Sequence, residues 1–288
     1  MDALNRRRAV TAVQAILVLN ALPAFVNLMS IPGRTERWFV WTVKPPANAR
    51  ILGVMYGSAC LLGVFGYAAR TWPRQRATFV VVAPFAVAAT IVTLVTLKPF
   101  RAHPWYELAY WLLMYSILFV LVPLVFVLEE RAEGGRLPVE APLPAAARAG
   151  VAALGALLLV AGIGLLFELS YATRLWPFAI TPLVARILGV WLGCLGLAHV
   201  WAAWDGDRLR ARALLLSMPP TGALLALVPL LHRDDLRAHP GAALVAYLGI
   251  AGAMAALPLI ALSWQPRARP GPHRAGDAAA ASPPPFSL

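Results

Sequence analysis

Residues 50–54 read Arg-Ile-Leu-Gly-Val, and residues 186–190 read Arg-Ile-Leu-Gly-Val again. We call the shift in numbering that carries Arg50 to Arg186 the repeat spacing. Each copy follows a run rich in tryptophan and proline, residues 38–46 in the first case and 176–182 in the second. Each copy also stands at the start of a long apolar segment. These shared surroundings indicate that the chain contains a duplicated unit.

The same spacing relates residues that are not apolar. Residues 101–104 read Arg-Ala-His-Pro, as do residues 237–240, and Pro84 corresponds to Pro220. Chance similarity between apolar helices would match Leu and Val rather than Arg, His and Pro. We therefore interpret the match as an internal repeat.

The composition is that of a membrane protein. Of the 288 residues, 60% are hydrophobic and 13% are charged, whereas soluble domains carry about a quarter charged residues. Apolar runs of about 18 residues or more recur, as transmembrane helices require. The net charge of +12 does not indicate nucleic-acid binding, because the basic residues are scattered in small groups between apolar runs. The predicted partner is the lipid bilayer.

We expect an all-α polytopic membrane protein with eight transmembrane helices, arranged as two parallel four-helix repeats. The first repeat, residues 1–128, has helices at residues 9–30, 49–69, 77–97 and 106–128. The second repeat, residues 149–264, has helices at residues 149–170, 185–204, 211–231 and 241–264. A charged linker occupies residues 129–148, and residues 265–288 are expected to form a disordered tail.

The orientation follows from the helix count and the basic residues. Four helices return the chain to its starting side, so the repeats should be related by a pseudo-two-fold axis along the membrane normal. Fifteen Lys and Arg residues fall on the side of the chain ends and the linker, and ten on the other. The positive-inside rule therefore predicts a multi-pass protein of the cytoplasmic membrane with both ends and the linker in the cytoplasm.

In each copy of the repeated motif, an arginine is followed at i+3 and i+7 by glycines that share its helix face. These residues are Arg50, Gly53 and Gly57 in the first copy and Arg186, Gly189 and Gly193 in the second. Glycines spaced in this way let two helix backbones approach closely in a membrane. We expect the two motif helices to be inner helices that pack against each other, with an arginine at the outer end of each seam.

Charged residues near the predicted outer surface are candidates for a ligand site between the repeats. They are Lys44, Arg50, Arg101, His103, Glu107, Arg186, Arg237 and His239. One interpretation is a site for a lipid or an anionic small molecule. In the alternative, which we favour, each arginine snorkels, caps loop carbonyls or pairs with an acid such as Glu36 or Glu168. Glu107 either binds a cation or proton or complements the dipole at the start of its helix.

Other polar residues suggest either helix contacts or a cavity. Asn20 and Asn27 are seven residues apart and share a helix face. They either join the first helix to a neighbour or line a cavity. Thr90, Thr93 and Thr96 form a second polar stripe, which we expect to bond its own backbone. Because the second half lacks both stripes, a polar cavity should lie in the first half.

Signals for metals and cofactors are weak, and none is predicted. His103 and His239 lie in separate loops without an acidic or cysteine cluster, and a metal site needs several matched ligands. Only His199 approaches the membrane depth that bis-histidine haem ligation would need. Cys60 and Cys194 are interpreted as small buried hydrophobic residues.

Three functional hypotheses remain. The first is binding or transport of a hydrophobic or anionic small molecule at the outer interface between the repeats. The second is a non-catalytic scaffold or accessory subunit with a membrane protein partner. The third is a lipid-modifying enzyme that uses His103 or Glu107. The sequence lacks a Walker A loop, a Gly-x-Ser-x-Gly elbow and a His-Glu-x-x-His motif, which disfavours an enzyme.

Overall fold

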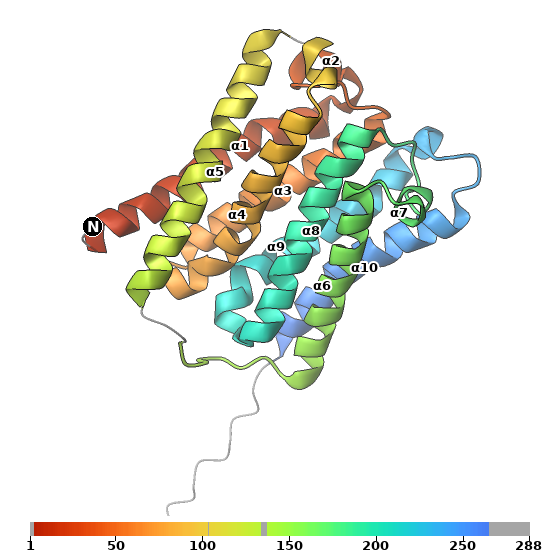
Figure 1. Ribbon diagram of the computed structural model, residues 1–288. Coiled ribbons are helices and arrows are strands. Elements are labelled where there is room, and N and C mark those ends of the chain that lie inside the picture. Colours follow the sequence, from red (N-terminus) through yellow and green to blue (C-terminus); the bar gives the residue numbers. More distant parts are fainter. Residues whose placement is uncertain (1–2, 103, 134–136, 265–288) are drawn as a thin grey trace, which may run out of the picture.

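The computed structural model describes residues 3–102, 104–133 and 137–264. Within these residues, eight helices are long and apolar enough to cross a membrane. They are α1 (Ala3–Ser30), α3 (Pro46–Ala68), α4 (Trp72–Val95), α5 (Trp105–Glu133), α6 (Ala145–Leu166), α8 (Pro182–Asp205), α9 (Arg208–Leu231) and α10 (Gly241–Ser263). The prediction of an all-helical, multi-pass membrane protein is confirmed (Figure 1).

Several helices have bounds that differ from those expected, and local backbone chemistry explains the differences. The helix expected at residues 77–97 begins at Trp72, since the extended Thr71 and Pro73 favour a helix start there. Pro182 likewise opens α8. The helix expected to end at residue 170 ends at Leu166, because Glu168 has a left-handed backbone with φ 54°.

The linker is shorter than predicted. α5 continues to Glu133 and α6 begins at Ala145, so both helices take up part of the expected linker, residues 129–148. α1 begins at Ala3 and includes the basic residues that were assigned to a head before the first helix. The predicted tail, residues 265–288, lies outside the described residues.

The two loops rich in tryptophan and proline contain short helices. The loop between α1 and α3 holds η1 (Pro32–Arg34) and α2 (Thr35–Trp38), and the loop between α6 and α8 holds α7 (Ser170–Arg174). We call the end of the bundle that carries these loops the collar end. It also carries η2 (Lys98–Ala102) between α4 and α5 and η3 (Arg233–Asp235) between α9 and α10. The opposite end, where α5 is joined to α6, is the linker end.

Helices of the first half lie on one side of the bundle, and those of the second half lie on the other (Figure 1). α3 and α8 are the most buried spans, as expected of the motif helices. However, they make few contacts with each other: α3 packs against α1 and α9, and α8 packs against α6 and α4. The two motif helices therefore touch, as at the rings of Tyr56 and Trp191, but the main partner of each is another helix.

The glycine seams instead close contacts within each half. A Cβ on Gly189 would collide with the backbone of α6 at Leu166 and Gly162, so α8 and α6 pack backbone to backbone. A Cβ on Gly53 would lie 3.0 Å from the Leu28 side chain and 3.2 Å from that of Met29 in α1. The seam of the first half is thus lined by side chains, and it leaves more room at Gly53 than the second seam leaves at Gly189, although a Cβ on Gly57 would lie 2.8 Å from the Phe25 ring.

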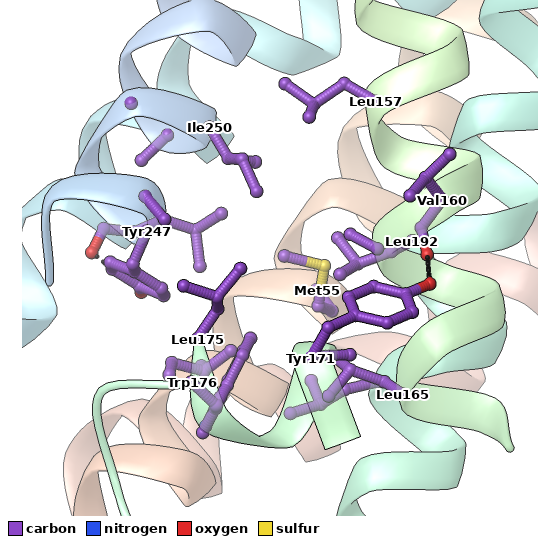
Figure 2. Close-up of a pocket in the computed structure, with 18 residues that line it drawn as sticks. Met55, Leu157, Val160, Leu165, Tyr171, Leu175, Trp176, Leu192, Tyr247 and Ile250 are labelled. Carbon is purple, nitrogen blue, oxygen red and sulfur yellow. Dashed lines mark hydrogen bonds between the residues drawn. The ribbon is translucent and has the colours of Figure 1, made fainter. Parts of the chain in front are cut away.

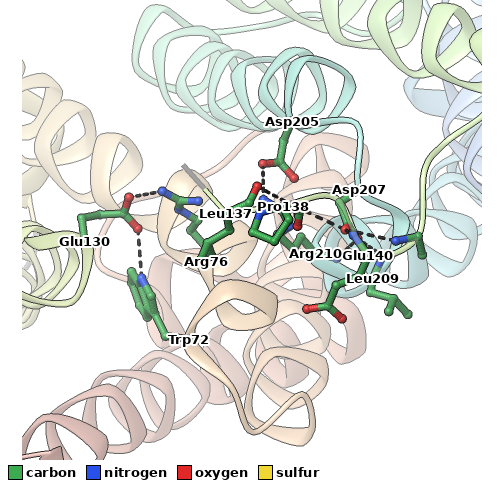
Figure 3. A network of polar contacts seen from close by, with 11 residues as sticks. Trp72, Arg76, Glu130, Leu137, Pro138, Glu140, Asp205, Asp207, Leu209 and Arg210 are labelled. Carbon is green, nitrogen blue, oxygen red and sulfur yellow. Dashed lines mark hydrogen bonds and ion pairs between the residues drawn. The ribbon is translucent and has the colours of Figure 1, made fainter. Parts of the chain in front are cut away.

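A network of polar contacts holds the linker end together (Figure 3). Asp207 caps α9 by accepting hydrogen bonds from the backbone N–H groups of Leu209 and Arg210. Its other carboxylate oxygen accepts from the N–H groups of Glu140 and Ala141 in the linker. Arg210 is almost fully buried and pairs with Asp205 at 2.8 Å. Asp207 and Arg210 direct their hydrogen bonds to the linker and to helix ends, which marks the network as structural, while Asp205 Oδ2 is buried without a hydrogen-bond partner.

Candidate functional site

The two repeated arginines lie at the collar end and make different contacts. Arg50 donates one hydrogen bond, 3.1 Å long, to the Met29 carbonyl at the end of α1. Its guanidinium also lies beside His232, just after α9. Burial and then Arg50 lower the pKa of His232, whereas Asp235, 3.1 Å away, raises it.

Arg186 is held by an acid and a hydroxyl. Its side chain lies 2.7 Å from the Glu168 carboxylate, after α6, and donates a 2.8 Å hydrogen bond to the Thr96 hydroxyl, after α4. Thr96 and His232 occupy the same position in the two halves, because they are related by the repeat spacing. Each arginine therefore reaches the end of the third membrane helix of the opposite half. These contacts agree with the structural alternative, in which each arginine caps loop carbonyls or pairs with an acid.

The other charged candidates have surroundings of their own or lie outside the described part of the chain. Arg237 donates a hydrogen bond to the Phe178 carbonyl, and His239 is exposed. Arg101 lies in η2, but its side chain and the whole of His103 lie outside the described part of the chain. Lys44 is exposed and lines a cavity between the collar loops of the two halves.

A second cavity, of about 380 Å³, lies in the first half between α1, α2, α3 and α5. We call it the polar cavity. Its lining combines two amides, an acid, an arginine and six aromatic rings with apolar side chains: Asn20, Pro23, Ala24, Asn27, Arg37, Trp38, Phe39, Val40, Tyr56, Tyr106, Glu107, Tyr110 and Trp111. It thus collects the amides of the first helix and the acid of the fourth membrane helix that the sequence singled out separately.

The floor of the polar cavity is rigid because its polar groups are bonded from behind. Tyr56 is buried, and its hydroxyl lies 3.0 Å from that of Tyr115. Trp111 donates a 3.0 Å hydrogen bond from Nε1 to the Thr93 hydroxyl. Thr93 in turn donates to the Ala89 carbonyl, as expected of the threonine stripe. The aromatic floor therefore keeps one shape.

The rim of the polar cavity is exposed. Tyr110 is 53% exposed and Tyr56 only 3%, so the cavity runs from the outer surface of the bundle to its core. Trp38 and Tyr106 are also exposed, and Pro23 lies on the outer face of α1. α1 and α5, which line the cavity, are among the least buried of the membrane-spanning helices.

Glu107 is the acid of this cavity. It is the third residue of α5, where the partial positive charge of the helix start stabilises a carboxylate. The dipole interpretation of Glu107 and a ligand-binding role are therefore compatible, since the same carboxylate lines the cavity.

A third cavity, of about 350 Å³, is lined by α6, α7, α8, α9 and α10 of the second half and by α3 of the first, and we call it the apolar cavity (Figure 2). Some of its lining residues are related to those of the polar cavity by the repeat spacing. The repeat spacing carries Tyr56, Tyr110 and Trp111 of the polar cavity to Leu192, Ala246 and Tyr247 of the apolar cavity.

Comparison of the chain with protein families, with characterised proteins and with solved structures finds no match. The site must therefore be interpreted from its own residues. Sequence reasoning missed the contribution of α2, whose Arg37 and Trp38 reach the polar cavity. It also missed Tyr56, although the change from Tyr56 to Leu192 between the repeats was a usable signal.

Proposed function

We propose that this protein binds a small amphiphilic molecule in the polar cavity, as a binding or transport protein of the membrane. The observation that carries the proposal is the joining of Asn20, Asn27 and Glu107 with an aromatic floor in one cavity that opens between two peripheral helices. Amides and a carboxylate inside a membrane are costly unless they have a role. Aromatic rings accept either an apolar chain or a cationic group.

The proposed location differs from the arginine site expected from the sequence. Neither Arg50 nor Arg186 lines the polar cavity, and the contacts of both arginines are explained by the fold. The hypothesis of a small-molecule binding protein is retained, and its site is proposed to lie within the first half rather than at the interface between the repeats.

We also propose that the two halves are parallel repeats related by a pseudo-two-fold axis. The pairing of helices supports this arrangement: α1 with α3 corresponds to α6 with α8, α4 with α5 to α9 with α10, and α3 with α9 to α8 with α4. With the excess of Lys and Arg at the linker end, the positive-inside rule places both ends of the chain in the cytoplasm and the polar cavity towards the outer face.

A thermal-shift experiment with three amphiphiles tests the proposed function. Dodecylamine, lauric acid and lysophosphatidylcholine differ in head-group charge, and each is added to the purified protein in detergent. We expect at least one of them to raise the melting temperature in proportion to the logarithm of its concentration. Glu107→Gln or Asn27→Leu should remove the shift. The head group of the amphiphile that raises the melting temperature indicates the charge of the ligand.

The controls separate the polar cavity from the arginines. Arg50→Ala should lower the melting temperature of the protein alone but keep the ligand-dependent shift. Loss of the shift in Arg50→Ala, with retention in Glu107→Gln, would instead support the site at the repeated motif. Absence of a shift with all three amphiphiles in the wild-type protein would argue against the proposed function and favour the scaffold hypothesis.

A lipid-modifying enzyme is a second candidate, because Glu107 lies in a polar pocket and does not face bulk lipid. The carboxylate would then act on a bound lipid as an acid or base. Incubation of the reconstituted protein with vesicles of phosphatidylglycerol and phosphatidylethanolamine, followed by mass spectrometry of the lipids, tests this candidate. A product formed by the wild type and absent in Glu107→Gln would support it.

A further inference from the structure

The apolar cavity of the second half has a wall of different chemistry from that of the polar cavity. α6 contributes Leu157 and Val160, α10 contributes Tyr247 and Ile250, α7 is followed by Leu175, and α3 contributes Met55. Figure 2 shows the side chains of α6 on one side of the cavity and those of α10 on the other. Among the residues that the structure describes, no charged side chain lines it.

The few polar atoms in this wall already have partners. The Tyr171 hydroxyl donates a 2.9 Å hydrogen bond to the Val160 carbonyl (Figure 2), and the Tyr247 hydroxyl donates a 3.0 Å bond to the Leu225 carbonyl. Trp176 donates from Nε1 to the Asn48 side chain at 3.0 Å. A ligand would find no free donor among these groups, and water would gain too few hydrogen bonds to fill the space. The cavity therefore selects a molecule without polar groups in its bound part.

The position of the cavity identifies such a molecule. α6 and α10 are peripheral membrane helices, and Gly249 at the outer surface of α10 forms part of the lining. A Cβ on Gly249 would have nothing within 4 Å, so the wall is open at this point. The medium outside α6 and α10 is the hydrocarbon of the bilayer.

The short helix α7 adds a charge at the membrane surface. Tyr171 and Leu175 line the cavity from α7 and the residue after it, and the exposed Arg174 ends the same helix. α7 belongs to the collar end and lies in the loop between the membrane-spanning helices α6 and α8. An arginine there suits the phosphate of a lipid whose chain enters the cavity.

We propose that the apolar cavity binds one acyl chain of a membrane phospholipid, with the phosphate of that lipid beside Arg174. The second half then holds a structural lipid. This inference rests on the apolar wall and on α7, and it is independent of the function proposed for the polar cavity.

Fluorescence quenching by brominated lipids tests the inference. The protein is reconstituted in vesicles of phosphatidylcholine with or without brominated acyl chains, and the signal of Trp176 is obtained as the difference between the wild type and Trp176→Tyr. Bromine quenches tryptophan on contact, whereas Trp176 is only 8% exposed at the protein surface. We expect strong quenching of Trp176 despite this burial.

Two glycines of α10 provide matched variants. Gly249→Leu fills the mouth of the cavity and should reduce the quenching of Trp176 by half or more. Gly252→Leu should leave it unchanged, because Gly252 is equally free of neighbours but does not line the cavity. Ala246→Leu is a second filling variant, from one turn earlier on α10. No quenching of Trp176 in the wild type, or equal quenching in the Gly249→Leu and Gly252→Leu variants, would overturn the proposal.

Discussion

The polar and apolar cavities occupy corresponding places in the two halves but have opposite chemistry. Each is lined by the first, second and fourth membrane helices of its half and by a short collar helix, and the apolar cavity is lined in addition by α3 and α9. Glu107, which lines the polar cavity, corresponds to Ala243 at the repeat spacing. On the proposed functions, the comparison suggests a division of roles: residues shared at the repeat spacing support the fold, and residues that differ at that spacing set the chemistry of each cavity.

The strongest test of the scaffold compares the first glycine of each motif. Gly189→Ala should destabilise the protein by about 3 kcal/mol, because the new methyl group meets the backbone of α6. Gly53→Ala should cost about 1 kcal/mol, because the Met29 side chain can move and alanine favours the helix, whereas Leu28 Cβ, 3.0 Å from the new methyl group, must shift slightly. Melting temperatures of the two variants in the same detergent check this difference. Equal losses would mean that the two seams are packed alike.

A second comparison concerns the residues that precede the third membrane helix of each half. Asp207 caps α9 through its carboxylate, whereas its counterpart Thr71 makes no side-chain cap on α4. Asp207→Ala should therefore cost about 2 kcal/mol and Thr71→Ala less than about 0.5 kcal/mol. Thermal melts of both variants measure this, and a larger loss for Thr71→Ala would contradict the asymmetry.

Asp207 also predicts a pH dependence. Burial alone would raise the pKa of Asp207, but the four backbone N–H groups lower it below its ordinary value. The carboxylate then stabilises the fold above the unfolded-state pKa of about 4, and this stabilisation is lost as the pH falls through the lower folded-state pKa. Melting curves between neutral and acid pH should show a steeper loss in the wild type than in Asp207→Asn. An equal loss of melting temperature with falling pH in the two proteins would show that Asp207 is not the source of the pH dependence.

Replacement of either repeated arginine by alanine should have a smaller effect on stability. Arg186→Ala should lower stability by about 1 kcal/mol, since the pair with Glu168 is about one-third exposed and partly screened. Arg50→Ala should cost roughly half as much, because Arg50 makes a single hydrogen bond to a carbonyl and lies beside His232. Thermal melts at low and high salt check both values. If Arg50→Ala cost more, a role for Arg50 beyond these contacts would be indicated.

The sequence predicted the fold better than the site, for physical reasons. Apolar runs and loop charges report the eight helices directly, because the bilayer allows few alternatives. The repeat also placed α3 and α8 in the core. The partners of their glycine seams could not be predicted, since a Gly-x-x-x-Gly face fits any close helix, and α6 brings glycines of its own, Gly155 and Gly162, against α8.

The site was only partly predictable. Asn20, Asn27 and Glu107 stood out as polar residues in apolar segments, but their meeting in one cavity depends on how α1 and α5 lie against each other. Arg50 and Arg186 were candidates for a ligand site because the motif that contains them occurs twice. Recurrence is what a structural role predicts, since both halves need the same contact, whereas a ligand site needs only one.

Paired cysteine labelling tests the contrast between the cavities most directly. Tyr110→Cys and Ala246→Cys occupy corresponding positions, in a background with Cys60 and Cys194 replaced by alanine. A positively charged methanethiosulfonate reagent should modify the Tyr110→Cys variant about tenfold faster or more, because an apolar cavity disfavours a charged molecule. Equal rates, or faster modification of Ala246→Cys, would contradict the assignment of one polar and one apolar cavity.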